Sequence, residues 1–181
     1  MDGSKTLNFN QSGFKLEGRK LHFSKIGAIN VKLHRALTGK VKGVIVKRSL
    51  SRKWYAVFQV ENSVVNHLPE TGKAVGLDMG VKHFLSDSIG RQIENPKFYE
   101  KSLARLRATH RILSRKEKTS KNRAKARVRL ARVYERLVNQ RDDFLHKLSR
   151  CHVNTYDVTA VEDLNVRSMV RNHHLLSAKN P

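Results

Sequence analysis

Apolar and polar positions alternate in different ways along the chain, and each pattern predicts a different element. Within residues 44–60, β-branched and aromatic side chains flank a polar break at 47–53, which predicts an antiparallel β-hairpin. Upstream, shorter apolar runs interrupted by Gly18 and Gly27 predict further strands. We therefore expect residues 7–61 to form a small β module with basic residues interleaved.

A linker and a second β-rich segment are expected next. Residues 62–73 contain Pro69 and Gly72 and form the best candidate linker of the chain. Residues 74–94 then contain three short strand-like runs, separated by Gly80 and by a turn at 87–90, which predict a β-meander. The expected domains are a β module at 1–66 and a second domain at 74–181.

The apolar spacing changes to three and four residues after Asn95-Pro96, a pair typical of a helix start. A polar break at 116–122 divides this region, so we expect an antiparallel helical hairpin at about 97–151. The apolar-rich run at 156–162 predicts one more strand, which we expect to join the first strand of the meander in parallel. The fold class is therefore α+β or α/β.

The charge of the chain points to a polyanionic partner. It has 37 Lys and Arg against 15 Asp and Glu, a formal net charge of +22 and a pI near 10.7. Self-repulsion on this scale favours nucleic acid as the partner, and with less support an anionic membrane surface. Residues 97–136 alone hold 15 Lys and Arg but 3 Asp and Glu, whereas a merely solvated face normally mixes both signs. The candidate phosphate contacts are Arg115, Lys116, Lys118, Lys121, Arg123, Lys125 and Arg127.

Cysteine content and the N-terminal sequence bear on the compartment. Cys151 is the only cysteine, which excludes an internal disulfide and a cysteine-rich zinc site within these residues. We find no secretion signal and no run of about 18 apolar residues. The expectation is a cytoplasmic protein, associated with the nucleoid in a prokaryote, that needs no zinc.

Two carboxylates are the candidate catalytic and metal-binding groups. Asp78 lies in the apolar run AVGLDMG and Glu162 ends the run TAVE. If the two strands are neighbours, both carboxylates can share divalent cations, and hard oxygen ligands suit Mg²⁺ or Mn²⁺. The alternative for an isolated strand Asp is a turn-capping or salt-bridged residue, but the flanking Gly76 and Gly80 would permit close approach of a substrate backbone. Asp163 should face the opposite way, while Asp87 and Asp157 are expected to be turn or edge residues.

The ordered series VGLDMGVKHFLSDSIGRQIENPKFY, LSRKEKTSKNRAKARVRLARVYERLVNQRDDFLHKLSR and YDVTAVEDLNVRSMVRNHHL resembles the RuvC-like part of TnpB (OrfB) transposon proteins, relatives of type V CRISPR effectors. Upstream, SGFKLEGRKLHFSKIGAINVKLHR resembles the end of their wedge β-barrel. The resemblance implies a partial RNase H-like (RuvC-like) domain with an inserted basic helical hairpin, preceded by a partial wedge-type β-barrel module. It also implies guide RNA and DNA as partners and Mg²⁺ as cofactor, with Asp78 and Glu162 as the first and second catalytic acids.

The chain also departs from that family pattern. Members carry a third catalytic Asp, a four-cysteine zinc ribbon and a helical recognition domain, so we expect a fragment, a split gene or a decayed copy. Little or no DNA cleavage by the isolated chain follows. A non-catalytic RNA- or DNA-binding protein and a ribosomal-protein-like RNA binder remain as alternatives. Trp54, Tyr55 and Phe58 are expected to pack in the hairpin core rather than to stack on bases.

Overall fold

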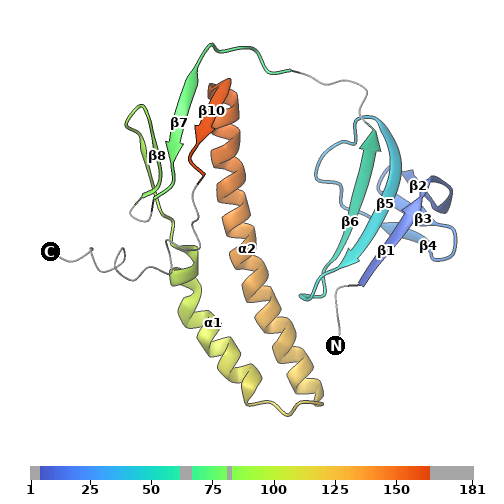
Figure 1. Ribbon diagram of the computed structural model, residues 1–181. Coiled ribbons are helices and arrows are strands. Elements are labelled where there is room, and N and C mark those ends of the chain that lie inside the picture. Colours follow the sequence, from blue (N-terminus) through green and yellow to red (C-terminus); the bar gives the residue numbers. More distant parts are fainter. Residues whose placement is uncertain (1–4, 62–66, 81–82, 164–181) are drawn as a thin grey trace. The chain divides into compact units, whose positions relative to one another are not determined.

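A computed structural model describes residues 5–61, 67–80 and 83–163 and gives the chain an α+β fold. The strands are β1 (Lys5–Asn10), β2 (Phe14–Glu17), β3 (Lys20–Phe23), β4 (Gly27–Asn30), β5 (Lys40–Arg48), β6 (Trp54–Glu61), β7 (Ala74–Asp78), β8 (His83–Asp87), β9 (Gln92–Glu94) and β10 (Val158–Val161). The helices are the short η1 (Gln11–Gly13), α1 (Phe98–Ser114) and α2 (Lys121–Thr155). The strands pair in the orders β1-β5-β6, β2-β3-β4 and β10-β7-β8-β9 (Figure 1).

The contacts divide the chain into two compact units, Met1–His67 with Phe98–Asp142 and Leu68–Lys97 with Asp143–Pro181. The division after His67 falls inside the expected linker. The expected domain at 74–181 includes the whole helical hairpin, whereas the contacts group most of that hairpin with the N-terminal strands. No helix among the described residues is both long enough and apolar enough to cross a membrane.

The N-terminal strands form two small antiparallel sheets that share one core. Leu21 and Phe23 of β3 and Val44 of β5 are buried at its centre, and each such side chain contributes roughly 1.5–3 kcal/mol by leaving water. Partly buried side chains from both sheets surround them: Phe9, Phe14, Leu16, Val31, Val41, Val46, Ala56 and Phe58. The shared core explains why strands of four residues are stable here, because their apolar faces are covered.

The hairpin expected within 44–60 is confirmed as β5 and β6, which pair antiparallel from Lys40↔Glu61 to Arg48↔Trp54. The expected core packing of its aromatic residues holds only for Phe58. It is wrong for Trp54 and Tyr55, which are 58% and 44% exposed. Both lie at the end of the hairpin beyond the shared core, where Arg48 packs over the Trp54 ring at 5.6 Å.

The helical region begins and divides as the spacing predicts, with α2 extending beyond residue 151 to Thr155. Figure 1 shows α1 and α2 as an antiparallel hairpin. Leu106 of α1 and Leu130 and Leu137 of α2 are buried together between the two helices. Apolar residues at the expected three- and four-residue spacing therefore hold the hairpin together, and most of its charged side chains are exposed.

In the second unit, β7, β8 and β9 form the expected antiparallel meander. The predicted parallel addition of the last strand is also confirmed, because β10 pairs with β7 from Val158↔Ala74 to Val161↔Leu77. A parallel pair needs a long crossover connection, which β8, β9, α1 and α2 supply. The pairing brings the ends of two strands that are more than 80 positions apart in sequence to the same edge.

Candidate functional site

Asp78 and Glu162 lie at the carboxyl ends of neighbouring parallel strands. Asp78 is the last residue of β7, and Glu162 follows β10 directly. The register pairs Val161 with Leu77, so its continuation by one residue aligns Glu162 with Asp78. Neighbouring strands are about 4.8 Å apart, and residues at the same level of a parallel pair point to the same face. The register therefore places the two residues next to each other at one edge of the sheet.

Asp78 lies in the expected strand, at the last position of β7, and both carboxylates are exposed. The reason is its position: Val75 is buried in the middle of β7, whereas Asp78 stands where the chain leaves the sheet. Asp163 is exposed as well and follows Glu162 outside the strand.

Despite 37 Lys and Arg in the chain, no basic side chain of the described residues forms an ion pair with Asp78 or Glu162. The salt-bridge alternative for Asp78 therefore has no support in this part of the chain. No third His, Cys, Asp or Glu within the described ranges joins them in a group suited to a metal ion. Within the described residues, this edge thus offers two carboxylates.

Asp157 fixes the register that aligns the two carboxylates. Its carboxylate accepts hydrogen bonds from the Thr71 N–H at 2.9 Å, the Thr71 hydroxyl at 2.9 Å and the Gly72 N–H at 2.6 Å. The Asp157 N–H donates in turn to the Lys73 carbonyl at 2.9 Å. Hydrogen bonds from the backbone and hydroxyl of Thr71 lower the pKa of Asp157, against a smaller opposing effect of burial. Gly72 has φ +67°, a left-handed conformation that favours glycine.

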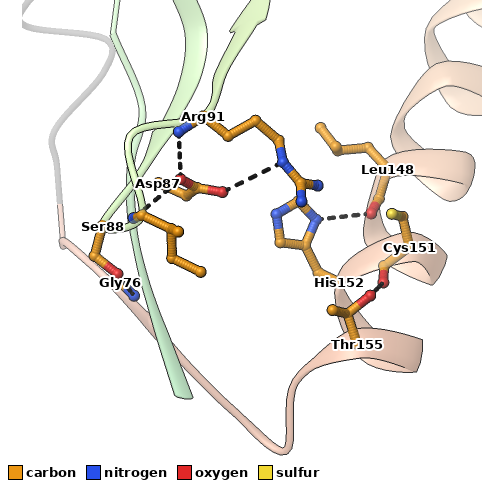
Figure 2. A network of polar contacts seen from close by, with 9 residues as sticks. Gly76, Asp87, Ser88, Arg91, Leu148, Cys151, His152 and Thr155 are labelled. Atoms are coloured by element: carbon orange, nitrogen blue, oxygen red, sulfur yellow. Dashed lines mark hydrogen bonds and ion pairs between the residues drawn. The ribbon is translucent and has the colours of Figure 1, made fainter. Parts of the chain in front are cut away.

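Asp87 has a structural role in the turn between β8 and β9, as expected. It accepts hydrogen bonds from the N–H groups of Ile89 at 3.1 Å and Arg91 at 2.7 Å, and Arg91 Nε lies 3.8 Å from its other oxygen (Figure 2). The adjacent Ser88 occupies the space beside Gly76: its N–H donates to the Gly76 carbonyl at 2.9 Å and its hydroxyl accepts from the Gly76 N–H at 3.1 Å. Ser88 therefore fills the space beside Gly76 that was expected to admit a substrate backbone.

The candidate phosphate contacts lie on the outside of the helical hairpin with one exception. Arg123 is partly buried, and its Nη1 donates to the Leu113 carbonyl at 3.1 Å and the Lys116 carbonyl at 2.8 Å. These carbonyls belong to the end of α1 and the loop after it, which lack partners within the helix. The other six side chains are exposed: Arg115, Lys116, Lys118, Lys121, Lys125 and Arg127.

Glu135 joins the β5–β6 turn to α2, a contact that sequence reasoning missed. Its carboxylate accepts hydrogen bonds from the hydroxyls of Ser51 at 2.8 Å and Tyr55 at 3.0 Å, and Lys53 Nζ lies 2.7 Å away. Burial raises the pKa of Glu135, but hydrogen bonds from Lys53, Ser51 and Tyr55 together outweigh it, and the net pKa is lowered. The sequence did hold a signal for this role, because acidic residues are rare in this region and Glu135 is one of 3 acids at 97–136.

Comparison with known proteins relates the chain to mobile-element proteins. Residues 57–173 match the model of the OrfB family of IS605 elements, described as "Probable transposase". A protein of Streptomyces pristinaespiralis with the provisional name RNA-guided DNA endonuclease is 39% identical over 135 residues, which cover 75% of this chain and 33% of the relative. A provisionally named RNA-guided DNA endonuclease InsQ of Escherichia coli K12 is 33% identical over 159 residues, which cover 87% of this chain and 39% of the relative.

Proposed function

Because the chain belongs to the OrfB family of IS605-type transposases, we propose that it binds guide RNA and DNA as part of an RNA-guided DNA endonuclease. The chain spans 33% and 39% of the length of the two relatives, whose names supply this activity. We infer an RNase H-like, RuvC-like relationship for the sheet containing β7 and β10, and a wedge-type barrel relationship for β1 to β6. A protein with these partners would be found with the nucleoid of a prokaryotic cell.

Asp78 and Glu162 are the proposed catalytic acids and ligands of Mg²⁺ or Mn²⁺. The observation that carries this assignment is the parallel register of β7 and β10, which aligns the two residues at one sheet edge. Exposed carboxylates without a basic partner in the described part of the chain fit the hard oxygen donors that Mg²⁺ prefers, and their exposure leaves space for retained waters. The ion, when bound, would supply an activated water and stabilise the leaving oxygen of a phosphodiester. The two side chains hold it, and Asp157 positions the strands that carry them.

The basic helical hairpin is the proposed backbone-binding surface. Six of the seven candidate side chains are exposed, and such side chains neutralise phosphates without reading sequence. In RNA-guided complexes base pairing carries target specificity while the protein contacts backbone shape, which suits this composition. The proposal therefore assigns sequence recognition to the guide and affinity to this surface.

Metal binding provides the test of the carboxylate assignment. Mn²⁺ titration followed by water-proton relaxation should detect binding to the full chain, and Asp78→Asn and Glu162→Gln should each abolish it. Asp163→Asn is the matched control, since it removes an equal charge one position further along and should retain binding. Equal Mn²⁺ affinity for the chain and all three variants would contradict the assignment of Asp78 and Glu162.

A non-catalytic role is the second candidate, favoured by the absence of a third ligand among the described residues. In that case the chain binds RNA and DNA with an affinity that falls steeply with salt, and Asp78→Asn leaves that binding unchanged. Mg²⁺-dependent cleavage of DNA that Asp78→Asn abolishes would exclude this candidate. An affinity that does not respond to salt would argue against both candidates.

A further inference from the structure

Three arginines surround a small cavity in the first unit. Arg48 and Arg52 come from the β5–β6 hairpin and Arg127 from α2, and the cavity between them measures about 200 Å³. Pockets for drug-sized ligands usually measure roughly 300–1,000 Å³, so this one can enclose only part of a ligand of that size, and the rest would lie against its open rim. Only Arg127 was among the residues that the sequence suggested, because the other two lie far from it along the chain.

The cavity is cationic without compensation. None of its lining residues is acidic, and none of the three arginines forms an ion pair with an acid of the described residues. Glu135, which follows the lining residue Tyr134, is already bonded to Lys53, Ser51 and Tyr55. An anionic group would therefore meet guanidinium groups whose charge is available.

Apolar and aromatic side chains complete the lining. Leu50 is 59% exposed and Tyr134 43% exposed, although both are of the size that normally packs in a core. Val128 and Ala131 of α2 add further apolar surface between the arginines. The combination of apolar and aromatic side chains with guanidinium groups matches a nucleotide, whose base is flat and weakly polar and whose phosphate is anionic.

The walls of the cavity are held in place before any ligand arrives. The Ser51 hydroxyl bonds both the Ser49 hydroxyl at 2.7 Å and Glu135, which ties the turn to α2. Arg52 has φ +67°, a left-handed conformation that costs free energy in any residue with a side chain. Glycine would avoid that cost, and backbone strain of this kind is often found at functional sites.

We propose that this cavity binds one unpaired nucleotide of a bound strand, with its phosphate on Arg48, Arg52 and Arg127 and its base against Leu50 and Tyr134. The inference rests on the proposed function for the presence of a nucleic acid, and adds a defined position to it. The proposed nucleotide site predicts that the affinity for single-stranded nucleic acid depends on the shape of the cavity as well as on the total charge of the surface.

A steric block separates shape from charge. Ala131→Leu adds apolar volume to the cavity without changing charge, and Ala108→Leu makes the same change at an exposed position of α1. Binding is measured at fixed salt by fluorescence anisotropy with labelled single-stranded RNA, single-stranded DNA of the same sequence, and abasic forms of both. We expect Ala131→Leu to lower the affinity for base-bearing strands about tenfold and the affinity for abasic strands far less. Ala108→Leu should change neither affinity.

The charged wall offers a second variant should Ala131→Leu fail to fold. Arg127→Gln should weaken binding more than Arg107→Gln, an equal loss of charge at an exposed position of α1. Circular dichroism confirms that each variant is folded, and a larger effect on RNA or on DNA identifies the strand that supplies the nucleotide.

The outcomes distinguish the two proposals. Pocket variants that match their controls on every strand, while the unaltered chain binds with salt-dependent affinity, would overturn the pocket alone. An unaltered chain that binds none of the strands would overturn the proposed function and the pocket with it.

Discussion

Asp157 Oδ2 accepts a hydrogen bond from the Gly72 N–H at 2.6 Å, and this contact joins the segment before β10 to the segment before β7. Together with the two donors of Thr71 it determines where the parallel pair begins. The alignment of Asp78 with Glu162 four residues later depends on that starting point. A residue at the opposite end of the strands thus positions the candidate metal ligands.

Substitution of Asp157 tests this dependence. Asp157→Ala removes the acceptor for Thr71 and Gly72, so we expect faster hydrogen exchange of the β10 amides and at least a severalfold loss of Mn²⁺ affinity. Asp163→Ala is the control, because it removes a carboxylate from the same region that is not part of the clamp. Unchanged exchange and metal affinity in Asp157→Ala would show that the register is set elsewhere.

The pH dependence of the clamp follows from the direction of its pKa shift. Folding lowers the pKa of Asp157, chiefly through hydrogen bonds from Thr71, so the ionised form is favoured in the folded chain. Its stabilising effect is therefore complete above the ordinary Asp pKa of about 3.9 and is lost as the pH falls through the lowered value. Hydrogen exchange or NMR of the β10 amides should show constant protection between neutral pH and about pH 5, with loss only at lower pH. Loss of protection near neutral pH would contradict this account.

Glu135→Gln should weaken the attachment of the β5–β6 turn to α2. The substitution removes the charge that pairs with Lys53 and weakens the hydrogen bonds from Ser51 and Tyr55, and such charged hydrogen bonds contribute about 1.5–3 kcal/mol. We expect the free energy of unfolding to fall by about 1–2 kcal/mol in urea denaturation. Glu117→Gln, an exposed acid in the loop between the helices, should change it by less than about 0.5 kcal/mol.

Arg123 and its neighbours should respond differently to substitution. Arg123→Gln removes the donor to the carbonyls of Leu113 and Lys116, so its main expected effect is a loss of about 1–2 kcal/mol in the free energy of unfolding. Lys125→Gln, at an exposed position, should leave stability unchanged and reduce the salt dependence of RNA binding by roughly 0.7–0.9 in the logarithmic slope. Interchanged results would reassign Arg123 to the binding surface.

Arg52→Gly should separate stability from binding. Glycine relieves the left-handed φ of +67° but costs backbone entropy, so the free energy of unfolding should change by no more than about 1 kcal/mol. Affinity for single-stranded RNA should fall nonetheless, because one of the three arginines of the cavity is lost. Urea denaturation and anisotropy on the same samples measure both quantities, and a large loss of stability would show that Arg52 is needed by the fold.

Local patterns predicted the elements of this fold well. The β-branched runs around Val44 and Val57 identified a hairpin, and the three- and four-residue apolar spacing with its polar break identified two helices that pack through Leu106, Leu130 and Leu137. The parallel pairing that aligns Asp78 with Glu162 also followed from the order of elements. In each case the information lies in residues close together in sequence or in a general rule of chain connection.

Contacts between distant side chains were beyond the same reasoning. Nothing near Glu135 in sequence indicates Ser51 or Lys53, and the exposure of Trp54 depends on where the shared core ends. The capping role of Arg123 was hidden among chemically similar neighbours. Such roles depend on the three-dimensional path of the chain. The same type of side chain can stabilise the fold at one position and be exposed to solvent at a neighbouring one.

The position of β10 at the edge of its sheet has a practical consequence for work with the purified protein. One side of this strand pairs with β7, while its other side faces no strand among the described residues, and Val158 and Val161 are 60% and 56% exposed. An apolar edge strand of this kind is a template for pairing with another extended chain and hence for self-association. Concentration series by analytical ultracentrifugation should therefore precede quantitative titrations, so that dimers formed through this edge are not mistaken for ligand-induced changes.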